Sequence, residues 1–545
     1  MTDTTLDHAA PAAPRTKGFL AAVERLGNRL PDPVFIFFIL IGVLMAVSVV
    51  ASLLDLSAQH PVLQDASGAP ETIQAVSLLS AENVQRLWVD MPKTFTHFHP
   101  LGYVLVVMLG AGVAERSGFF ASGMKAAVAR TPALLLTPVV ALVAMIGNHA
   151  ADAGYVVLIP LAGLLFAAAG RHPLAGIAAA FAGVSGGFSA NVSPGQLDAL
   201  LFGITEEAVD VSSLDPTWTT NLAGNWYFII AMTVVYLPLI WYVTDRIIEP
   251  RLGPWNPGAE TGELAEQFEE SGPLSPAQVS GMKRAGLAAL AVVGLWTFMT
   301  LGPGTPLIAE DACPPGSVAA GECSVHTTLR PLYTSLVGGF FVLFLACGWA
   351  YGRAAGTITK GQDLVDMMAG AMKDMGYYLV LAFAAAHFVA MFGWSNLGLI
   401  SAVHGANGIQ ATGLPLPIVL GLMVLLTAVL NLFIGSASAK WALLAPILVP
   451  MFMLLGFSPE AATAAYRVGD GATNIITPLM VYFPLILVFA QRWNKEFGLG
   501  SLTALMIPYS VAMLVVGVVL MMAWVMFGWD LGPDSPVRYV VPGLG

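Results

Sequence analysis

The stretch PVFIFFILIGVLMAVSVVASLL, residues 33–54, runs without a single charged side chain. Its length exceeds the roughly 20 apolar residues that span a hydrocarbon core about 30 Å thick. Residues 503–526 form a second uncharged run of similar length. Inside lipid, only helices and closed barrels satisfy all of their backbone polar groups, and the two-residue alternation of barrel strands is absent here. The sequence therefore predicts an all-α polytopic membrane protein.

The composition of the whole chain supports this class. Of its 545 residues, 57% are hydrophobic and 10% are charged, whereas a soluble domain carries about 25% charged residues. The net charge of −11 comes partly from five glutamates within residues 255–275, which we interpret as a solvated cytoplasmic loop. No basic stripe is present, so nucleic acid is not an expected partner. Walker, HExxH and GxSxG motifs are also absent, so we expect neither an enzyme nor a bound cofactor.

The order of apolar runs and basic loops predicts how the chain is organised. Lys and Arg residues precede the first span, which places the N-terminus of a multi-pass protein in the cytoplasm. Further apolar runs lie at 99–114, 132–147, 155–170, 173–190, 226–244, 285–302, 332–350, 376–393, 415–434, 441–456 and 477–490. We divide the chain into an N-terminal segment 1–30, a membrane half 31–245, a cytoplasmic acidic loop 246–284, a second membrane half 285–528 and a C-terminal tail 529–545.

An internal repeat relates the two membrane halves. When the chain is shifted by 286 positions, residues 151–183 fall on 437–469, and the matches include two prolines and two glycines. A broken polar stretch follows each copy, SANVSP at 189–194 and TNIITP at 473–478. Paired interrupted segments in corresponding places of two halves are the best sequence indication of a transporter binding site. We therefore predict two re-entrant helical hairpins, at about 150–194 and 435–478.

The second hairpin places ionisable side chains in apolar surroundings. Arg467, Asp470 and Asn474 are spaced so that they share one face of a helix. Charges within a membrane segment are costly and usually face a cavity or one another. We predict that Arg467 holds a substrate carboxylate, and that Asp470 either releases Arg467 on protonation or helps to hold a cation. The alternative is a purely structural Arg–Asp pair.

Other candidate site residues lie on the opposite arm and in the first hairpin. Trp441, near Ser436 and Ser438, either stacks on an aromatic substrate or packs within the membrane. Asp152 and Asp198 suit proton or cation handling, although Asp198 could equally cap the helix that follows it. The polar groups at the two breaks are candidate sodium ligands: Asn191, Ser193, Asn474 and Thr477, together with Asp470. The residues leave proton and sodium coupling both open.

Three cysteines complete the inventory of reactive side chains. Cys347 lies in an apolar span and is interpreted as a packing residue. Cys313 and Cys323 share one loop on the outer side, where a disulfide could persist. Zinc binding with His326 is the weaker alternative.

The stretch GSASAKWALLAPILVPMFMLLGFSPEAATAAYRVGDGATNIITPLMVYFPLI at 435–486 resembles the p-aminobenzoyl-glutamate transporter (AbgT) family, as do GVSGGFSANVSP at 183–194 and PDPVFIFFIL at 31–40. The resemblance implies a homodimer whose protomers each have about nine transmembrane helices and two re-entrant hairpins. It also implies uptake of p-aminobenzoyl-glutamate or export of sulfonamide antimetabolites. Family functional residues fall on Trp441, Pro459, Arg467, Asp470 and Pro478, and a looser match places another on Asp198.

These lines together predict an ion-coupled secondary transporter in a bacterial inner membrane. Its substrate would be p-aminobenzoyl-glutamate or a related anionic aromatic molecule, because an arginine and an aromatic ring suit that chemistry. A channel, or a membrane-embedded enzyme using Asp152, Asp198 and Asp470, is the alternative. The direction of transport is not determined by the sequence.

Overall fold

The structure of this protein is a computed structural model that describes residues 31–64, 67, 69–128, 131–150, 154–255, 274–301, 304–313 and 324–543. Its first half contains α2 (Pro33–Leu53), β1 (Ser57–Gln64), β2 (Pro70–Gln74), α3 (Ala81–Val89), α4 (Met91–Thr96), α5 (His99–Arg116), α6 (Phe119–Val128), α7 (Leu136–Ile146), α8 (Ile159–Ala168), α9 (Pro173–Phe181), α10 (Gln196–Ser212), α11 (Trp226–Val243) and α12 (Glu249–Leu252). The second half contains α14 (Pro276–Phe298), α16 (Val325–Thr328), α17 (Arg330–Thr334), α18 (Leu336–Ala355), α19 (Gly361–Asp374), α20 (Gly376–Trp394), α21 (Leu397–Ala411), α22 (Leu416–Asn431), α23 (Ala437–Leu454), α24 (Pro459–Asn474), α25 (Phe483–Gln491) and α26 (Leu499–Phe527).

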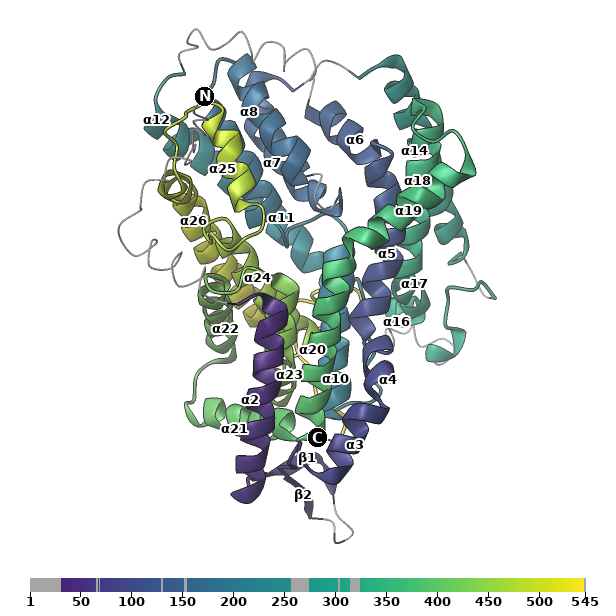
Figure 1. Cartoon of the computed structure of the whole chain (residues 1–545), viewed down its shortest axis with the longest axis vertical. Coiled ribbons are helices and arrows are strands. Elements are labelled where there is room, and N and C mark those ends of the chain that lie inside the picture. Colours follow the sequence, from purple (N-terminus) through teal and green to yellow (C-terminus); the bar gives the residue numbers. More distant parts are fainter. Residues whose placement is uncertain are drawn as a thin grey trace, which may run out of the picture.

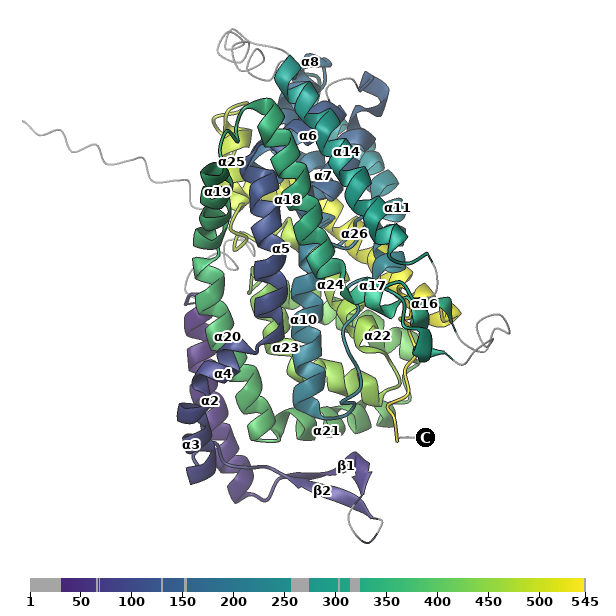
Figure 2. The same cartoon turned by 90° about the vertical axis from the view of Figure 1, so that its right-hand side faces the viewer.

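The prediction of a polytopic helical membrane protein is confirmed. Among the described residues, seven helices are long and apolar enough to cross a membrane. An eighth span results if α5 and α6, which are bent by 62° at their junction, are counted together. The only sheet in the described residues pairs β1 with β2 in antiparallel fashion at one end of the molecule (Figure 2). The expected number of about nine spans stays a prediction.

Helix α10 is absent from the apolar runs of the sequence because its second half is acidic. Three carboxylates in this half find partners on α5 or in the following loop. Tyr103 donates from its hydroxyl to Glu206 Oε2 at 2.8 Å, and His99 Nδ1 lies 3.1 Å from Glu207 Oε2. These contacts let an acidic helix pack inside an apolar bundle, since paired charges cost less to bury than isolated ones.

Helical hairpins lie at the two predicted positions and point toward opposite ends of the molecule, while their re-entrant course stays a prediction. The first consists of α8 and α9, and Arg171 at its tip donates to Glu249 Oε1 at 3.0 Å in α12. The second consists of α23 and α24, and its tip meets the C-terminal tail, where Ser458 N donates to Val537 O at 3.2 Å. Figure 1 shows α12 and α8 near one end of the molecule, and α21 with the C-terminus near the other.

The internal repeat extends to details of the backbone. Gly170 and Gly456, which match under the 286-residue shift, end the first arm of each hairpin with φ of +73° and +84°, where glycine is favoured. Pro173 and Pro459 then begin α9 and α24 at the first helical turn, where the missing N–H costs nothing. The sequence repeat is therefore also a repeat of structure.

A matched glycine also sets how closely each hairpin packs. A Cβ added at Gly183 would lie 2.5 Å from Ala144 Cβ, and one added at Gly469 would meet the backbone of α22. The partner helices α7 and α22 occupy corresponding places before the two hairpins. Each hairpin therefore lies against a preceding helix at a distance that only glycine allows.

The C-terminal tail, residues 529–545, is packed against the protein through residue 543. Leu531, Val537 and Val541 are buried, and Asn221 donates from Nδ2 to Pro533 O at 2.6 Å. Tyr539 N donates to Gly456 O at 3.1 Å. The tail therefore covers the tip of the second hairpin.

The cysteine predictions are partly resolved. Cys347 is a free, buried cysteine of α18, in agreement with the packing interpretation. Cys313 is disulfide-bonded, while Cys323 lies outside the described residues. Asp152 of the first hairpin also lies outside them.

Candidate functional site

A buried ion pair joins the second hairpin to α10. Arg467 of α24 donates from Nη1 to Asp198 Oδ1 at 2.8 Å, and their side chains are 2% and 5% exposed. Asp198 is the third residue of α10, and its Oδ2 accepts the backbone N–H of Gly195 at 2.8 Å. Asp198 therefore does both things considered for it, because it caps its helix and also holds a charge.

A second buried ion pair lies within the hairpin itself. Lys440 Nζ of α23 is 2.5 Å from Asp470 Oδ1 of α24, and both side chains are almost fully enclosed. The same nitrogen donates to Asn431 Oδ1 at 2.5 Å. Each arm of the hairpin therefore supplies one member of a charge pair.

These contacts correct the predicted partner of Arg467. The shared helical face suggested that Arg467 faces Asp470, but each residue instead pairs with a different segment of the protein. A spacing of three along a helix allows contact without requiring it. Here Asp198 of α10 pairs with Arg467, and Lys440 of α23 pairs with Asp470. The two pairs leave all four charges neutralised.

Asn474 and Asn431 lie beside the Lys440–Asp470 ion pair. Together with Arg467, Asp198, Lys440 and Asp470 they form what we call the polar centre. Asn431 Nδ2 lies within 2.9 Å of Asp470 O, Thr473 Oγ1 and Asn474 Oδ1, and Asn474 Nδ2 is 3.4 Å from Asp470 Oδ2. Asn431 is the last residue of α22 and fully buried. The sequence interpretation missed Lys440 and Asn431, although the lysine within an otherwise apolar hairpin arm was a visible signal.

Trp441 lies beside this centre but is a packing residue in this conformation. Its ring stacks on Tyr466 with centroids 4.5 Å apart, and its Nε1 donates to Thr205 Oγ1 of α10 at 3.0 Å. The side chain has no exposed surface. Its neighbour Tyr466 donates from its hydroxyl to Ala437 O at 2.6 Å, which joins the two arms of the hairpin.

The remaining predicted residues of the second hairpin shape its backbone. Ser436 caps α23 by accepting the Ala439 N–H at 3.3 Å, and its hydroxyl lies 3.3 Å from that of Ser438. Thr477 donates from its hydroxyl to Leu432 O at 3.4 Å, which joins the segment after α24 to the end of α22. Pro478 follows in the same break.

Polar residues at the first break form a separate group. Asn191 donates from Nδ2 to Met145 O at 3.3 Å, and Ser193 Oγ lies 3.1 Å from His149 Nε2. Neither is within hydrogen-bond distance of Asp470 or Asn474 among the contacts of the described residues. The structure therefore divides the candidate sodium ligands between two places.

A cavity of about 350 Å³ lies where the two repeats meet. Residues from both halves line it: Val104, Met108, Asn148, Tyr155, Phe188, Gln196, Leu197, Leu200, Met375, Tyr378, Gly435, Ala437, Asn474, Met480, Val481 and Tyr482. Tyr155 and Tyr482 stack at one wall, with centroids 4.3 Å apart and planes at 11°. An apolar cavity with a few convergent amides and hydroxyls is typical of a small-molecule site. Asn474 connects it to the Lys440–Asp470 ion pair.

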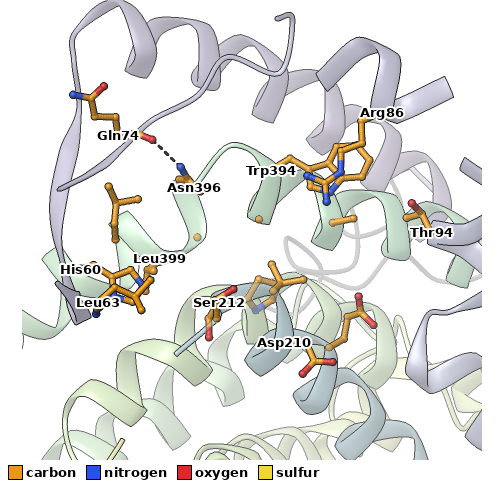
Figure 3. A pocket seen from close by; sticks show the side chains of 18 of the residues that line it. His60, Leu63, Gln74, Arg86, Thr94, Asp210, Ser212, Trp394, Asn396 and Leu399 are labelled. Atoms are coloured by element: carbon orange, nitrogen blue, oxygen red, sulfur yellow. Dashed lines mark hydrogen bonds between the residues drawn. The ribbon is translucent and has the colours of Figure 1, made fainter. Parts of the chain in front are cut away.

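A second cavity, of about 700 Å³, lies at the end of the molecule that carries β1 and β2 (Figure 3). Asp210 and Ser212 at the end of α10 line it, opposite Arg86, whose guanidinium lies 4.8 Å from the centre of the Trp394 ring. Helix α10 thus begins at the polar centre and ends in this cavity. Because the cavity lies at this end of the molecule and has a lining of mixed charge, we interpret it as a vestibule.

The fold and this centre define a class of protein. Two oppositely directed hairpins from an internal repeat, with buried charges at their junction and a cavity between them, are the architecture of a secondary transporter. The chain belongs to the AbgT putative transporter family, whose model matches residues 18–539. It is 34% identical to the p-aminobenzoyl-glutamate transport protein of Escherichia coli (strain K12) over 96% of this chain and 97% of that protein.

Two solved structures show the same fold. The YdaH transporter of Alcanivorax borkumensis is 42% identical, with a TM-score of 0.82, and the match covers 92% of this chain and 100% of that one. MtrF of Neisseria gonorrhoeae is 39% identical, with a TM-score of 0.85 over 95% of this chain and 100% of that one. MtrF is described as illuminating a class of antimetabolite efflux pumps. The protein is therefore a membrane transporter and not an enzyme.

Proposed function

We propose that this transporter moves p-aminobenzoyl-glutamate or a related aromatic carboxylate, coupled to a gradient of protons or sodium ions. The observation that carries the proposal is the cavity between the two repeats, which has stacked tyrosines on one wall and is also lined by Asn474, a neighbour of Asp470 about two helical turns from Arg467 on α24. Aromatic walls suit a benzamide ring, and a guanidinium suits a carboxylate. The name of the Escherichia coli relative supports the same substrate class.

The partner of Arg467 gives the proposal a mechanism. Within the described part of the protein, Arg467 Nε is buried and has no hydrogen-bond partner, while Nη1 is held by Asp198. A substrate carboxylate would bind the guanidinium bidentately and compete with Asp198. Because Asp198 also caps α10, losing Arg467 would shift the start of the helix that lines the cavity. Substrate binding would then change the position of α10.

Asp470 gives a route for coupling. It shares its carboxylate between Lys440 and the amide of Asn474, so a change in its charge would reach the wall of the cavity. In the proposed cycle, Trp441 supports the hairpin through Tyr466 and contacts substrate only after a rearrangement. Pro459 and Pro478 would set the ends of the moving hairpin arm.

Export of sulfonamide antimetabolites is a second candidate function. It is favoured by the predominantly apolar lining of the cavity, which needs no carboxylate on its ligand, and by the description of MtrF. A sulfonamide would use the tyrosine wall more and Arg467 less. The two substrates therefore differ in their expected sensitivity to loss of the guanidinium.

We also propose that the protein is a homodimer in a bacterial inner membrane, with its N-terminus in the cytoplasm and both hairpins re-entrant. Basic residues before the first span support this orientation. Exposed apolar side chains on α14, such as Leu287 and Leu290, need lipid or a second copy to cover them. Light scattering of the detergent complex and cysteine accessibility in whole cells measure the two properties.

Counterflow in proteoliposomes tests the transport proposal. Wild type should exchange labelled p-aminobenzoyl-glutamate saturably and accumulate it under a proton or a sodium gradient. Arg467→Met and Asp470→Asn should lose this accumulation, while Arg246→Met, which removes an exposed arginine, should retain it. Absence of saturable exchange by folded wild type would contradict the substrate. Equal activity of wild type and the site variants would contradict the site, and unsaturable flux would indicate a channel.

The same vesicles separate the two candidate functions. Sulfonamide flux that survives Arg467→Met, together with lost exchange of the carboxylate, would fit a cavity that serves both. Sulfonamide flux without any carboxylate exchange would favour export as the main activity.

A further inference from the structure

The ammonium group of Lys440 lies in a site built of oxygen atoms. Its Nζ is 2.5 Å from Asp470 Oδ1, 2.5 Å from Asn431 Oδ1 and 3.3 Å from the backbone carbonyl of Ile434. Lys440, Asp470 and Asn431 are at most 2% exposed. The ammonium donates hydrogen bonds to Asn431 Oδ1 and to the Ile434 carbonyl, and it pairs with Asp470 Oδ1 by charge.

The three oxygens come from the kinds of group that bind a small hard cation. A carboxylate, an amide carbonyl and a backbone carbonyl at a helix break are the ligands that discontinuous transporter helices offer to sodium. Ile434 belongs to the unwound stretch between α22 and α23, so its carbonyl is not committed to a helix. Without the lysine, this arrangement would be a cation cage.

The oxygen ligands are also held by contacts with residues other than Lys440. Asn431 Nδ2 lies 2.7 Å from Asp470 O and 2.9 Å from Thr473 Oγ1, which orients the amide oxygen toward Nζ. The amide and the carboxylate are therefore held by α22 and α24, and Lys440 enters from α23. The Lys440 ammonium therefore occupies a site whose oxygen ligands belong to α22, α24 and the segment between α22 and α23.

We infer that the cation position of the second hairpin is filled by the protein's own Lys440 ammonium, so that this protein binds no sodium ion at Asp470. The residues present do not fit the sodium site expected there from the sequence, because a positive charge already takes its ligands. The inference concerns the coupling ion and so rests on the proposed function, but it is tested by binding, without substrate or transport. Removing the ammonium while keeping the oxygens should create a sodium site.

Sodium binding to the purified, full-length protein in detergent tests the inference. Radioactive sodium is measured at constant ionic strength, with choline as the replacement cation, for wild type, Lys440→Met, Lys440→Gln and Lys283→Met. Methionine keeps most of the length of the lysine without its charge, and glutamine is the second variant if methionine prevents folding. Lys283 is exposed on α14 and serves as the matched control.

In wild type and in Lys283→Met, no sodium binding should depend on Asp470, so adding Asp470→Asn should change nothing. A folded Lys440 variant should gain stoichiometric sodium binding. The gained binding should disappear in Lys440→Met/Asp470→Asn, and sodium should raise the melting temperature of the single variant only. Sodium binding by wild type that is lost in Asp470→Asn would overturn the inference. Folded Lys440 variants that gain no sodium would overturn it as well, because the oxygens would then not form a cation site. Neither result depends on whether p-aminobenzoyl-glutamate is transported.

Discussion

The ion pair between Arg467 and Asp198 allows a quantitative prediction about stability. At the observed 2.8 Å, two unit charges attract by about 6 kcal/mol at an effective dielectric constant of about 20. Desolvation offsets much of this attraction, and removing one partner of a buried pair typically costs about 3–5 kcal/mol. Asp198→Asn keeps an oxygen for the Gly195 N–H but leaves the arginine charge unpaired. We therefore expect each single variant, Asp198→Asn or Arg467→Met, to lose roughly 4 kcal/mol.

The double variant should lose less than the sum of the two. With both charges removed, no unpaired charge remains, and a coupling of about 2–3 kcal/mol is expected between residues in direct contact. Thermal unfolding of the purified protein measures it. An unfolding entropy of about 2.1 cal/mol/K per residue gives roughly 1 kcal/mol/K for a protein of 545 residues, so each single variant should melt about 4 °C lower. Additive losses in the double variant would refute the pairing, and Arg246→Met controls for loss of an arginine.

Three further changes test packing and a helix start. Gly469→Ala puts a methyl group against the backbone of α22 and should cost on the order of 3 kcal/mol, whereas Gly408→Ala, with nothing within 4 Å, should not lower the melting temperature. Trp441→Phe keeps the stacked ring but loses its hydrogen bond to α10, and should cost about 1 kcal/mol in the same assay. The backbone N–H of Thr359 lowers the pKa of Asp363, at the start of the exposed α19, to about 2 from 3.8. The stabilising effect of the ionised carboxylate is fully present above pH 3.8 and is lost as pH falls toward 2. The protection factors of the amides in the first turn of α19, which are corrected for the intrinsic pH dependence of exchange, should therefore fall below about pH 4 and be lowest near pH 2. Unchanged exchange in Asp363→Asn would contradict that assignment.

Much of the fold follows from the sequence because a bilayer imposes a simple rule. Uncharged runs long enough to span lipid became helices, as α2 and α26 show. Helix α10 could not be recognised by this rule because it carries charges. These charges are neutralised by side chains of α5, which lie about 100 residues away in the sequence. The β1–β2 pair was also missed, since the loop that contains it carries no clear alternation.

The candidate site was located by the repeat but not resolved by it. Under the 286-residue shift, the two hairpins and their tips were recognisable from prolines and glycines. The actual charge pairs join Arg467 to a residue 269 positions away, and Lys440 to the opposite arm of its own hairpin. Such partners are set by how α10, α23 and α24 pack, and helical spacing alone favoured the wrong pair.

The matched glycines at the hairpin tips have a practical use. Since α7 to α9 correspond to α22 to α24 in opposite orientation, the arrangement of one repeat is a template for an alternative arrangement of the other. Placing each repeat in the conformation of its counterpart, with Gly170 superposed on Gly456, would generate explicit coordinates for a transporter that opens to the other side of the membrane. Pairs of positions that are close in only one of the two arrangements can then be chosen with the 286-residue shift and replaced by cysteines.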